Sequence, residues 1–359
     1  MSEADRGRRD GAPVWPGLEA LAELRPGWFA LVMATGIISG AAHELGLAIL
    51  SDAFLAAAAI AYAVLCVLTA VRIVAHPRSM AADLDRHDHV FGMLAFVAAS
   101  GVLGARLLAA GAAGRGVGLA LTIAGALAWA VLVYMIPARL VTRTAGSVAL
   151  DAADGSWLMW VVATQSVAVS AATIAALRPR LAVALGFVAA TLWGFGIVLY
   201  LVLTGILTLQ LLLARAPAGG LTPPYWIIMG ATAISTLAAA RIALVPGPGP
   251  LPPEFVAGLG FVLWAFGTWW IPLLAVLGLR RRLRVRALPA YHPSWWSLVF
   301  PLGMYAAASE ALGQARQIPE LIVVAHVEIW IAVAAWALTA LALLMAASDR
   351  LRRNRRSTP

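Results

Sequence analysis

The chain is poor in charge and in cysteine, and it contains no lysine at all. Only 12% of its 359 residues are charged, whereas 62% are apolar, and the mean hydropathy is +0.87. A soluble protein of this length could not bury so much apolar surface, so lipid must be the solvent for most of it. Backbone groups in hydrocarbon must be paired within their own segment, which predicts an all-α integral membrane protein.

Other absences narrow the function. The single cysteine, Cys66, excludes a disulfide framework and a thiolate metal site. No nucleophile–base pair, phosphate loop or intramembrane set of metal ligands is recognisable, so we expect no enzyme, no cofactor, no bound metal and no ATP-driven transport. Residues 1–25 are polar and lack a hydrophobic core, so we expect no cleavable signal peptide.

Apolar runs between breakers predict ten membrane-spanning helices. They cover residues 26–46, 53–75, 90–112, 117–138, 156–177, 181–213, 222–245, 255–279, 294–314 and 318–347. The chain is thereby divided into an N-terminal tail over 1–25, a transmembrane domain over 26–347 and an arginine-rich tail over 348–359.

The basic residues, all of them arginine, predict the orientation. With both termini in the cytoplasm, 20 of the 26 arginines fall inside and 6 fall outside. This bias is typical of a multi-pass protein of the inner (plasma) membrane. The net charge of +9 therefore reports topology and contact with anionic lipid, and nucleic-acid binding is not expected.

Two repeats run through the predicted helices. Trp28, Trp157 and Tyr225 each stand seven residues before a threonine, and that threonine follows an alanine. Four even-numbered helices repeat a second pattern around a tryptophan, namely Trp129, Trp193, Trp264 and Trp336. Both helices of a hairpin thus recur, which predicts five helical hairpins in sequence. Chance similarity between apolar segments of biased composition is the alternative.

Small or polar residues recur near the middle of the odd-numbered helices. Recurrence at one depth favours residues that line a central pore, although small residues also serve plain helix packing. The candidates are Thr35, Gly36, Ser100, Thr164, Thr232 and Gly303.

The ninth predicted helix departs from the repeat. Pro301 removes a backbone donor and is expected to kink it. Phe300 precedes the kink, and a bulky ring there could close a narrow pore as an apolar gate. A phenylalanine that faces lipid or the core is the alternative.

Charged side chains within the spans are few, and each is a candidate for function. Arg106, Arg241 and Arg316 are expected near the outer ends of odd-numbered helices, where they could form an anion-attracting vestibule. Snorkelling to the interface is the alternative. Three titratable residues of the last hairpin, Glu310, His326 and Glu328, would suit proton coupling; they could equally sit at the interface or pair with arginine.

A histidine-rich segment at 83–89, with His76 upstream, has weak metal-ligand spacing. We interpret this segment as a solvated cytoplasmic loop. Only His76, His87 and His89 motivate the remote alternative of a membrane-bound metal-binding enzyme.

Two segments of the sequence resemble those of a known family. Pro26–Ser39, which reads PGWFALVMATGIIS, resembles the first-helix signature of the tellurite-resistance/dicarboxylate transporters, and Trp295–Pro301 is similar to their ninth helix. That family includes bacterial tellurite-resistance proteins, fungal malate permeases and sulfite pumps, and plant guard-cell slow anion channels. The resemblance covers about residues 25 to 347.

The resemblance implies a specific architecture. Ten helices would form five hairpins around a pseudo-fivefold central pore, with the odd-numbered helices inside, in a homotrimer with one pore per subunit. A phenylalanine that matches Phe300 would occlude the pore. We therefore expect passive transport of small inorganic anions or C4-dicarboxylates. The alternative is a proton-coupled transporter of sulfite, malate or tellurite-type oxyanions.

Overall fold

The computed structural model describes residues 21–143, 153–213, 222–284 and 291–357. Within these ranges the chain is helical and has no strand. The first twenty residues of the predicted N-terminal tail and the last two of the C-terminal tail lie outside them. The long helices are α2 (Phe29–Glu44), α3 (Ala48–Ala75), α6 (Leu94–Ala109), α7 (Ala112–Arg143), α9 (Met159–Leu177), α10 (Ala182–Leu212), α11 (Ile227–Ala243), α12 (Pro253–Arg284), α13 (Trp296–Arg316) and α14 (Pro319–Ser357).

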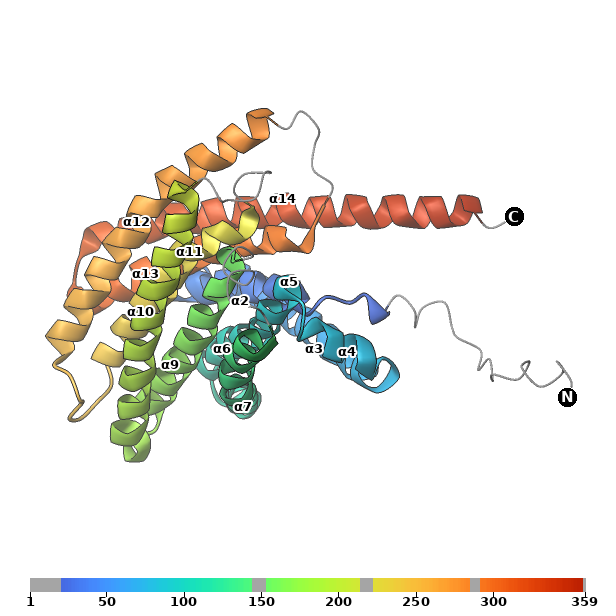
Figure 1. The fold of residues 1–359 in the computed structure, drawn as a ribbon. Helices are drawn as coiled ribbons and strands as arrows, with labels where there is room; N and C mark the ends of the chain where they lie inside the picture. The colour runs from blue at the N-terminus through green and yellow to red at the C-terminus, as the bar shows by residue number, and fades with distance from the viewer. Residues whose placement is uncertain (1–20, 144–152, 214–221, 285–290, 358–359) are drawn as a thin grey trace, which may run out of the picture.

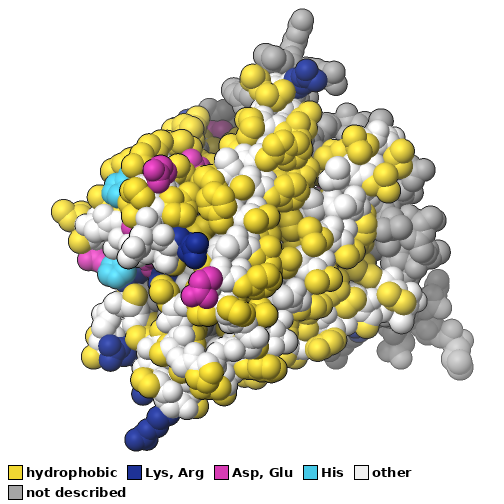
Figure 2. All heavy atoms as spheres, turned by 90° about the vertical axis from the view of Figure 1, so that its left-hand side faces the viewer, with side chains coloured by type: hydrophobic (Ala, Val, Ile, Leu, Met, Phe, Trp, Pro, Cys, Tyr) yellow, Lys and Arg dark blue, Asp and Glu magenta, His cyan; other side chains and the backbone are white. Residues whose placement is uncertain are grey.

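Eight helical segments in the described ranges are long and apolar enough to cross a membrane. They correspond to all the long helices except α2 and α13, whose crossing stays a prediction. Large apolar side chains such as Ile60, Leu127 and Leu338 are exposed on α3, α7 and α14. Figure 2 shows hydrophobic bands over much of one face of the molecule, with few charged side chains among them. This surface suits lipid and identifies a multi-pass membrane protein.

The long helices form an inner and an outer set. The inner helices α2, α6, α9, α11 and α13 contact one another in that order, and α13 returns to α2, so that they close a ring. Each is followed in the chain by an outer helix (α3, α7, α10, α12 or α14) that packs against it as a hairpin. In the candidate spans that contain the inner helices α6, α9 and α11, 78–83% of the residues are buried. In the spans of the outer helices the buried share is 11–28%. The described chain starts and ends on the same side of the bundle (Figure 1).

Every inner helix begins with a short 3₁₀ turn. These turns are η2 (Pro26–Trp28), η3 (Phe91–Met93), η4 (Gly155–Leu158), η6 (Pro223–Trp226) and η7 (Pro293–Trp295). They contact one another in the same cyclic order as the inner helices, and we term the closed set the collar. Each turn contains an aromatic residue, and the Phe91 and Trp157 rings of adjacent turns lie 5.1 Å apart. The aromatic residue that opens each sequence repeat is therefore part of the collar.

Glycine lets the collar turns approach backbone to backbone. A Cβ placed on Gly155 would lie 2.2 Å from the carbonyl oxygen of Pro224 in the adjacent turn. A Cβ on Gly92 would lie 3.0 Å from the backbone nitrogen of Gly27. No side chain fits at the first position without backbone movement, because real Cβ contacts are longer than this.

A hydrogen bond donated by a tryptophan or tyrosine side chain joins each outer helix to the next inner helix round the ring; we term these five bonds the cross-hairpin bonds. The indole N–H of Trp129 donates to the Thr164 hydroxyl at 3.0 Å, and that of Trp336 donates to the Thr35 hydroxyl at 2.9 Å. The remaining three run from Tyr62 to the Ser100 hydroxyl at 2.8 Å, from Trp193 to the Ser235 carbonyl at 2.9 Å and from Trp264 to the Ser309 hydroxyl at 2.8 Å. In two of these cross-hairpin bonds, Trp129 with Thr164 and Trp336 with Thr35, a tryptophan of one sequence repeat donates to a threonine of the other.

We expect Thr164→Val to lower stability by about 1–3 kcal/mol, because valine keeps the shape but leaves the Trp129 N–H without its acceptor. Thermal unfolding of the detergent-solubilised protein measures the loss. Thr191→Val is the matched control, since that hydroxyl is exposed and bonds to its own helix at the Phe187 carbonyl. Equal unfolding midpoints for the two variants would contradict the role of the cross-hairpin bond.

Candidate functional site: a cavity inside the helix ring

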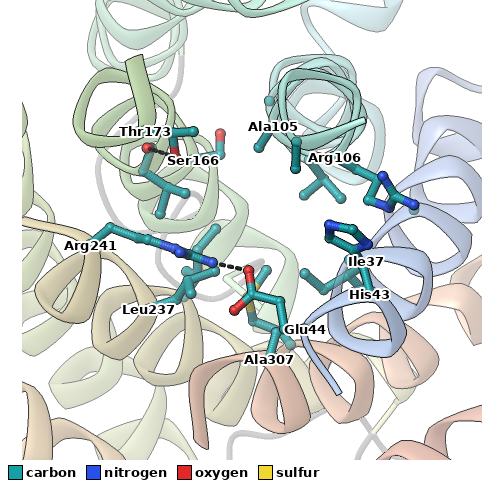
Figure 3. Close-up of a pocket in the computed structure, with 18 residues that line it drawn as sticks. Ile37, His43, Glu44, Ala105, Arg106, Ser166, Thr173, Leu237, Arg241 and Ala307 are labelled. Atoms are coloured by element: carbon teal, nitrogen blue, oxygen red, sulfur yellow. Dashed lines mark hydrogen bonds and ion pairs between the residues drawn. The ribbon is translucent and has the colours of Figure 1, made fainter. Parts of the chain in front are cut away.

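A cavity of about 130 Å³ opens at the end of the ring that lies away from the collar, which we term the far end. All five inner helices contribute to its lining, which places it on the axis of the ring. Figure 3 shows the cavity with side chains converging from these helices. The lining residues are Gly36, Ile37, Gly40, His43 and Glu44 of α2, Gly101, Val102, Ala105, Arg106 and Ala109 of α6, Ser166, Val169 and Thr173 of α9, Ile234, Leu237 and Arg241 of α11, and Met304 and Ala307 of α13.

The lining changes in character along the axis. Toward the collar it is made of small or apolar residues such as Gly36 and Gly101. At the far end it carries the charged or titratable side chains His43, Glu44, Arg106 and Arg241, which lie in the last turns of α2, α6 and α11. The mouth is therefore charged, whereas the lining nearer the collar carries no charged side chain.

Arg106 is a fixed positive charge in the cavity wall. Its Nε and Nη2 atoms donate to the Ser51 hydroxyl at 3.1 and 2.9 Å, and Nη2 lies 3.3 Å from Asp52 Oδ1. Ser51 is itself held by hydrogen bonds with Ser39 in both directions. The side chain of Arg106 is only 4% exposed, and its Nη1 atom has no hydrogen-bond partner in the described part of the chain.

Arg241 forms an ion pair with Glu44 across the mouth of the cavity. The two residues belong to α11 and α2, which are separated in the ring by α13. Figure 3 shows the two side chains reaching toward each other from opposite sides of the opening, with Ala307 of α13 nearby. Both are about a quarter to a third exposed. Glu44 is not recognisable as a site residue from the sequence alone, because nothing local connects it to a residue 197 positions away.

Phe300 is not part of the cavity lining, but it lies on the same helix as two residues that are. It is buried in α13, one helical turn before Met304, which lines the cavity. Residues four apart share a helix face, so Phe300 projects toward the axis on the collar side of the lining. Pro301, beside it, packs against α11, where a Cβ on Gly230 would lie 2.9 Å from the proline Cγ.

Comparison with known proteins identifies the family. The sequence model of a family described as voltage-dependent anion channel matches residues 23–344, nearly the whole chain. The chain belongs to the voltage-dependent anion channel family. The uncharacterized membrane protein Rv1735c of Mycobacterium tuberculosis is 37% identical over 162 residues, which is 45% of this chain and 82% of that protein. The uncharacterized transporter MJ0576 of Methanocaldococcus jannaschii is 31% identical over 123 residues, 33% of each chain.

In this member of the voltage-dependent anion channel family, the cavity lining includes only some of the predicted site residues. Gly36, Arg106 and Arg241 line the cavity. Arg316 is exposed at the end of α13 and does not line it. Gly303 packs on α2, where its Cβ would meet Ile37.

The four predicted hydroxyl residues face the outer helices. Thr35, Ser100 and Thr164 accept cross-hairpin bonds, and the Thr232 hydroxyl lies where a Cβ on Gly267 of α12 would stand. None of the four lines the cavity. Their recurrence at one depth has a structural cause, since each lies where an outer helix meets the ring.

The three residues considered for proton coupling are not part of the cavity lining. Glu310 is buried in α13; its Oε1 atom accepts a hydrogen bond from Gln314 at 2.7 Å, and its Oε2 atom has no hydrogen-bond partner in the ranges that the structure describes. His326 is exposed on α14 and Glu328 is half-buried there. The structure does not bring the three together as one site.

The interpretation of segment 83–89 as a solvated loop is wrong for Asp83 and His89. Both are buried, at the end of α4 (Pro77–Asp83) and in α5 (His87–Val90). The Asp83 carboxylate lies 2.6 Å from Nη1 of buried Arg72 and 2.7 Å from Nδ1 of His89, so it is neutralised by a partner from α3. Among the described residues, no group of three or more His, Cys, Asp or Glu could hold a metal ion.

A histidine at the collar predicts a pH dependence of stability. Arg25 Nη1 donates to His292 Nε2 at 2.8 Å. Partial burial and then the Arg25 charge lower the pKa of His292 below its ordinary 6.5. Folding thus favours the neutral ring, and this contribution is fully present above about pH 6.5 and is lost as the pH falls through the lower folded pKa.

We therefore expect the unfolding midpoint of this anion channel family member to fall on acidification from about pH 7.5 to about pH 5.5, and to fall less in His292→Asn. Thermal unfolding at a series of pH values measures both slopes. His326→Asn, which changes an exposed histidine on α14, should keep the parental slope. A parental slope in His292→Asn would show that other groups carry the pH dependence.

Proposed function

We propose that the protein conducts small anions, inorganic anions or C4-dicarboxylates, through a central pore inside the inner helices, gated by Phe300. The observation that carries this proposal is the cavity to which all five inner helices contribute and whose mouth holds Arg106 and Arg241. Membership of the voltage-dependent anion channel family supports the class of substrate.

The cavity suggests how conduction works. The two arginines create a positive potential at the mouth, which raises the local concentration of anions. Farther in, Gly36 and Gly101 contribute no side chains to the lining, and Phe300, one turn from Met304, would close the passage. An apolar ring excludes water from a narrow passage and so blocks a hydrated ion. Conduction in this scheme follows the electrochemical gradient and needs the ring of Phe300 to move aside.

We propose the matching architecture in the membrane. All ten long helices, α2 and α13 included, would span the bilayer as five hairpins with pseudo-fivefold symmetry. The closed ring, the collar and the recurring cross-hairpin bonds support that symmetry. The shared side of the described chain ends and the arginine distribution support cytoplasmic termini in the plasma membrane. The far end would then face outward, and a homotrimer with one pore per subunit is proposed by family analogy.

Anion flux in proteoliposomes tests the function. Vesicles that contain the purified protein should release chloride, nitrate or malate faster than protein-free vesicles when a gradient is applied. The substituted-anion series then ranks the substrates. Release no faster than from protein-free vesicles, for every anion of the series, would remove the proposal.

Glu310 favours a second candidate, a proton-coupled transporter of sulfite, malate or tellurite-type oxyanions. The motivating observation is its buried Oε2 atom, which has no hydrogen-bond partner among the described residues, since ionisable side chains inside membrane spans often mark proton pathways. Uptake with and without a pH gradient separates the candidates. Uptake that depends on the gradient, and loses this dependence in Glu310→Gln, supports coupling; indifference to the gradient supports the passive channel.

A further inference from the structure

The ion pair between Glu44 and Arg241 is placed where a permeating anion must pass. It spans the mouth of the cavity between two helices that are not neighbours in the ring. Both residues line the cavity, and their side chains reach toward each other over the opening (Figure 3). A bond between adjacent helices would reinforce the wall and leave the opening clear. This pair lies across the opening itself.

The chemistry of the pair resembles that of the proposed substrate. A guanidinium binds the oxygens of a carboxylate or a small oxyanion through the same N–H donors. The carboxylate of Glu44 therefore occupies the donors that an incoming anion would use. Because Glu44 is part of the same chain, it competes at a high effective concentration.

The second arginine of the mouth differs in this respect. Arg106 is directed to the neutral Ser51 hydroxyl and to Asp52, whose side chain is 75% exposed. Its charge is thus less neutralised than that of Arg241, and one of its nitrogens has no hydrogen-bond partner in the described residues. The mouth thus holds one buried arginine, held by Ser51 and Asp52, and one more exposed arginine whose donor is taken by Glu44.

We infer that Glu44 is a tethered competitor for the anion site of the mouth, and that an anion reaches Arg241 by replacing the Glu44 carboxylate. The ion pair sets the anion affinity of the mouth and keeps it below the value that two available arginines would give. This inference rests on the proposed function for its flux readout, and on the cavity alone for its binding readout.

Nitrate binding to the purified protein tests the inference without transport. A bound anion stabilises the folded protein by RT ln(1 + [L]/Kd), so the unfolding midpoint begins to rise when the nitrate concentration exceeds Kd. In Glu44→Gln, which keeps the size and removes the charge, we expect the same rise in midpoint at about a threefold or more lower nitrate concentration. Glu254→Gln is the matched control, because it removes one exposed carboxylate at the start of α12, also at the far end but outside the cavity.

A double variant identifies the route of the effect. If Glu44 acts through Arg241, the gain in Glu44→Gln disappears when Arg241→Gln is also present. Glu44→Asp is a second, milder variant that retains the charge but shortens the side chain; it should also bind nitrate more tightly than the parent. If Glu44→Gln does not fold, Glu44→Asp still tests whether Glu44 competes with nitrate for Arg241.

The outcomes separate clearly. Nitrate affinity that is unchanged or weaker in both Glu44 variants, equal gains in Glu44→Gln and Glu254→Gln, or a gain that persists without Arg241 would each overturn the inference. Nitrate flux through proteoliposomes then tells the two proposals apart. Tighter binding with no flux in any variant counts against the channel function alone, whereas flux in the parent that Glu44→Gln does not raise at low nitrate counts against the tethered competitor alone.

Discussion

Replacing Phe300 by alanine is expected to raise anion flux through the reconstituted protein by at least about tenfold, which corresponds to a barrier lowered by about 1.4 kcal/mol. Phe300 is fully buried in α13, one turn below the cavity residue Met304. Alanine at this position would extend the cavity toward the collar and let water enter the constriction. Flux of chloride and nitrate from proteoliposomes, normalised to the amount of protein inserted, measures the effect.

The control must lose a buried ring elsewhere. Phe54→Ala serves, because Phe54 is a buried residue of the outer helix α3 that packs on Trp336 with ring centroids 4.9 Å apart. Both variants should lose stability, since a Phe-to-Ala change in a core costs about 3–5 kcal/mol. Only Phe300→Ala should gain flux. If both conduct alike, or if neither exceeds the parent, Phe300 is not the gate.

Substituting alanine for Gly155 is expected to destabilise the protein by at least about 1–3 kcal/mol, the usual range for overpacking. The added Cβ would lie 2.2 Å from the carbonyl oxygen of Pro224 and 2.5 Å from the nitrogen of Tyr225. These are backbone atoms of the adjacent collar turn, so no side-chain rotation can relieve the clash. The turns η4 and η6 must separate, which should lower the unfolding midpoint and the yield of folded protein.

Gly27→Ala provides a close comparison. Gly27 lies in the equivalent turn η2, and a Cβ placed on it meets no atom within 4 Å. The two variants make the same chemical change in the same collar at two sites of different tightness. We expect Gly27→Ala to match the parent in unfolding midpoint. A similar loss in both variants would mean that backbone freedom of glycine, and not the close approach, is what the collar needs.

The sequence predicts the helices well, and the reason is physical. Apolar segments bounded by Pro, Gly and Arg give a strong signal in lipid, and each long helix in the described ranges overlaps one predicted span, to within a few residues at most ends. Eight of these helices are long and apolar enough to cross a membrane, and the crossing of α2 and α13 stays a prediction. The division into inner and outer helices was implied by the family resemblance, and the helix contacts agree with it. The family resemblance at Pro26–Ser39 agrees with the family match.

The sequence predicts less well which face of each helix points toward the cavity and which toward an outer helix. The threonine repeat was interpreted as a pore lining, whereas Thr35 and Thr164 bond to tryptophans of the outer helices. A sequence signal for these bonds was present, since a tryptophan recurs in the even-numbered helices as the threonine does in the odd-numbered ones. Pairing the two repeats across hairpins requires knowing that each outer helix contacts the next inner helix, and a single sequence does not contain that information.

Contacts between residues far apart in the chain cannot be predicted from this sequence. Glu44 and Arg241 meet only because the ring closes, and Asp83 is buried only because Arg72 of α3 lies beside it. An ion pair between distant residues leaves no local pattern in a sequence. Arg106 and Arg241 both line the cavity, whereas Arg316, which was expected to join them, does not, and the anion-attracting vestibule stays a prediction.

The cross-hairpin bond between Trp336 and Thr35 has a consequence for how the protein is made. It joins the last hairpin of the chain to the first, so its donor is synthesised some three hundred residues after its acceptor. Each of the other four such bonds joins consecutive hairpins and can form as soon as the second of them enters the bilayer. The Thr35 hydroxyl of the first hairpin therefore lacks this donor until α14 has been synthesised. A truncation before α13 leaves an open arc of inner helices, whereas one between α13 and α14 keeps the contact of α13 with α2 and loses only the outer helix and its bond to Thr35.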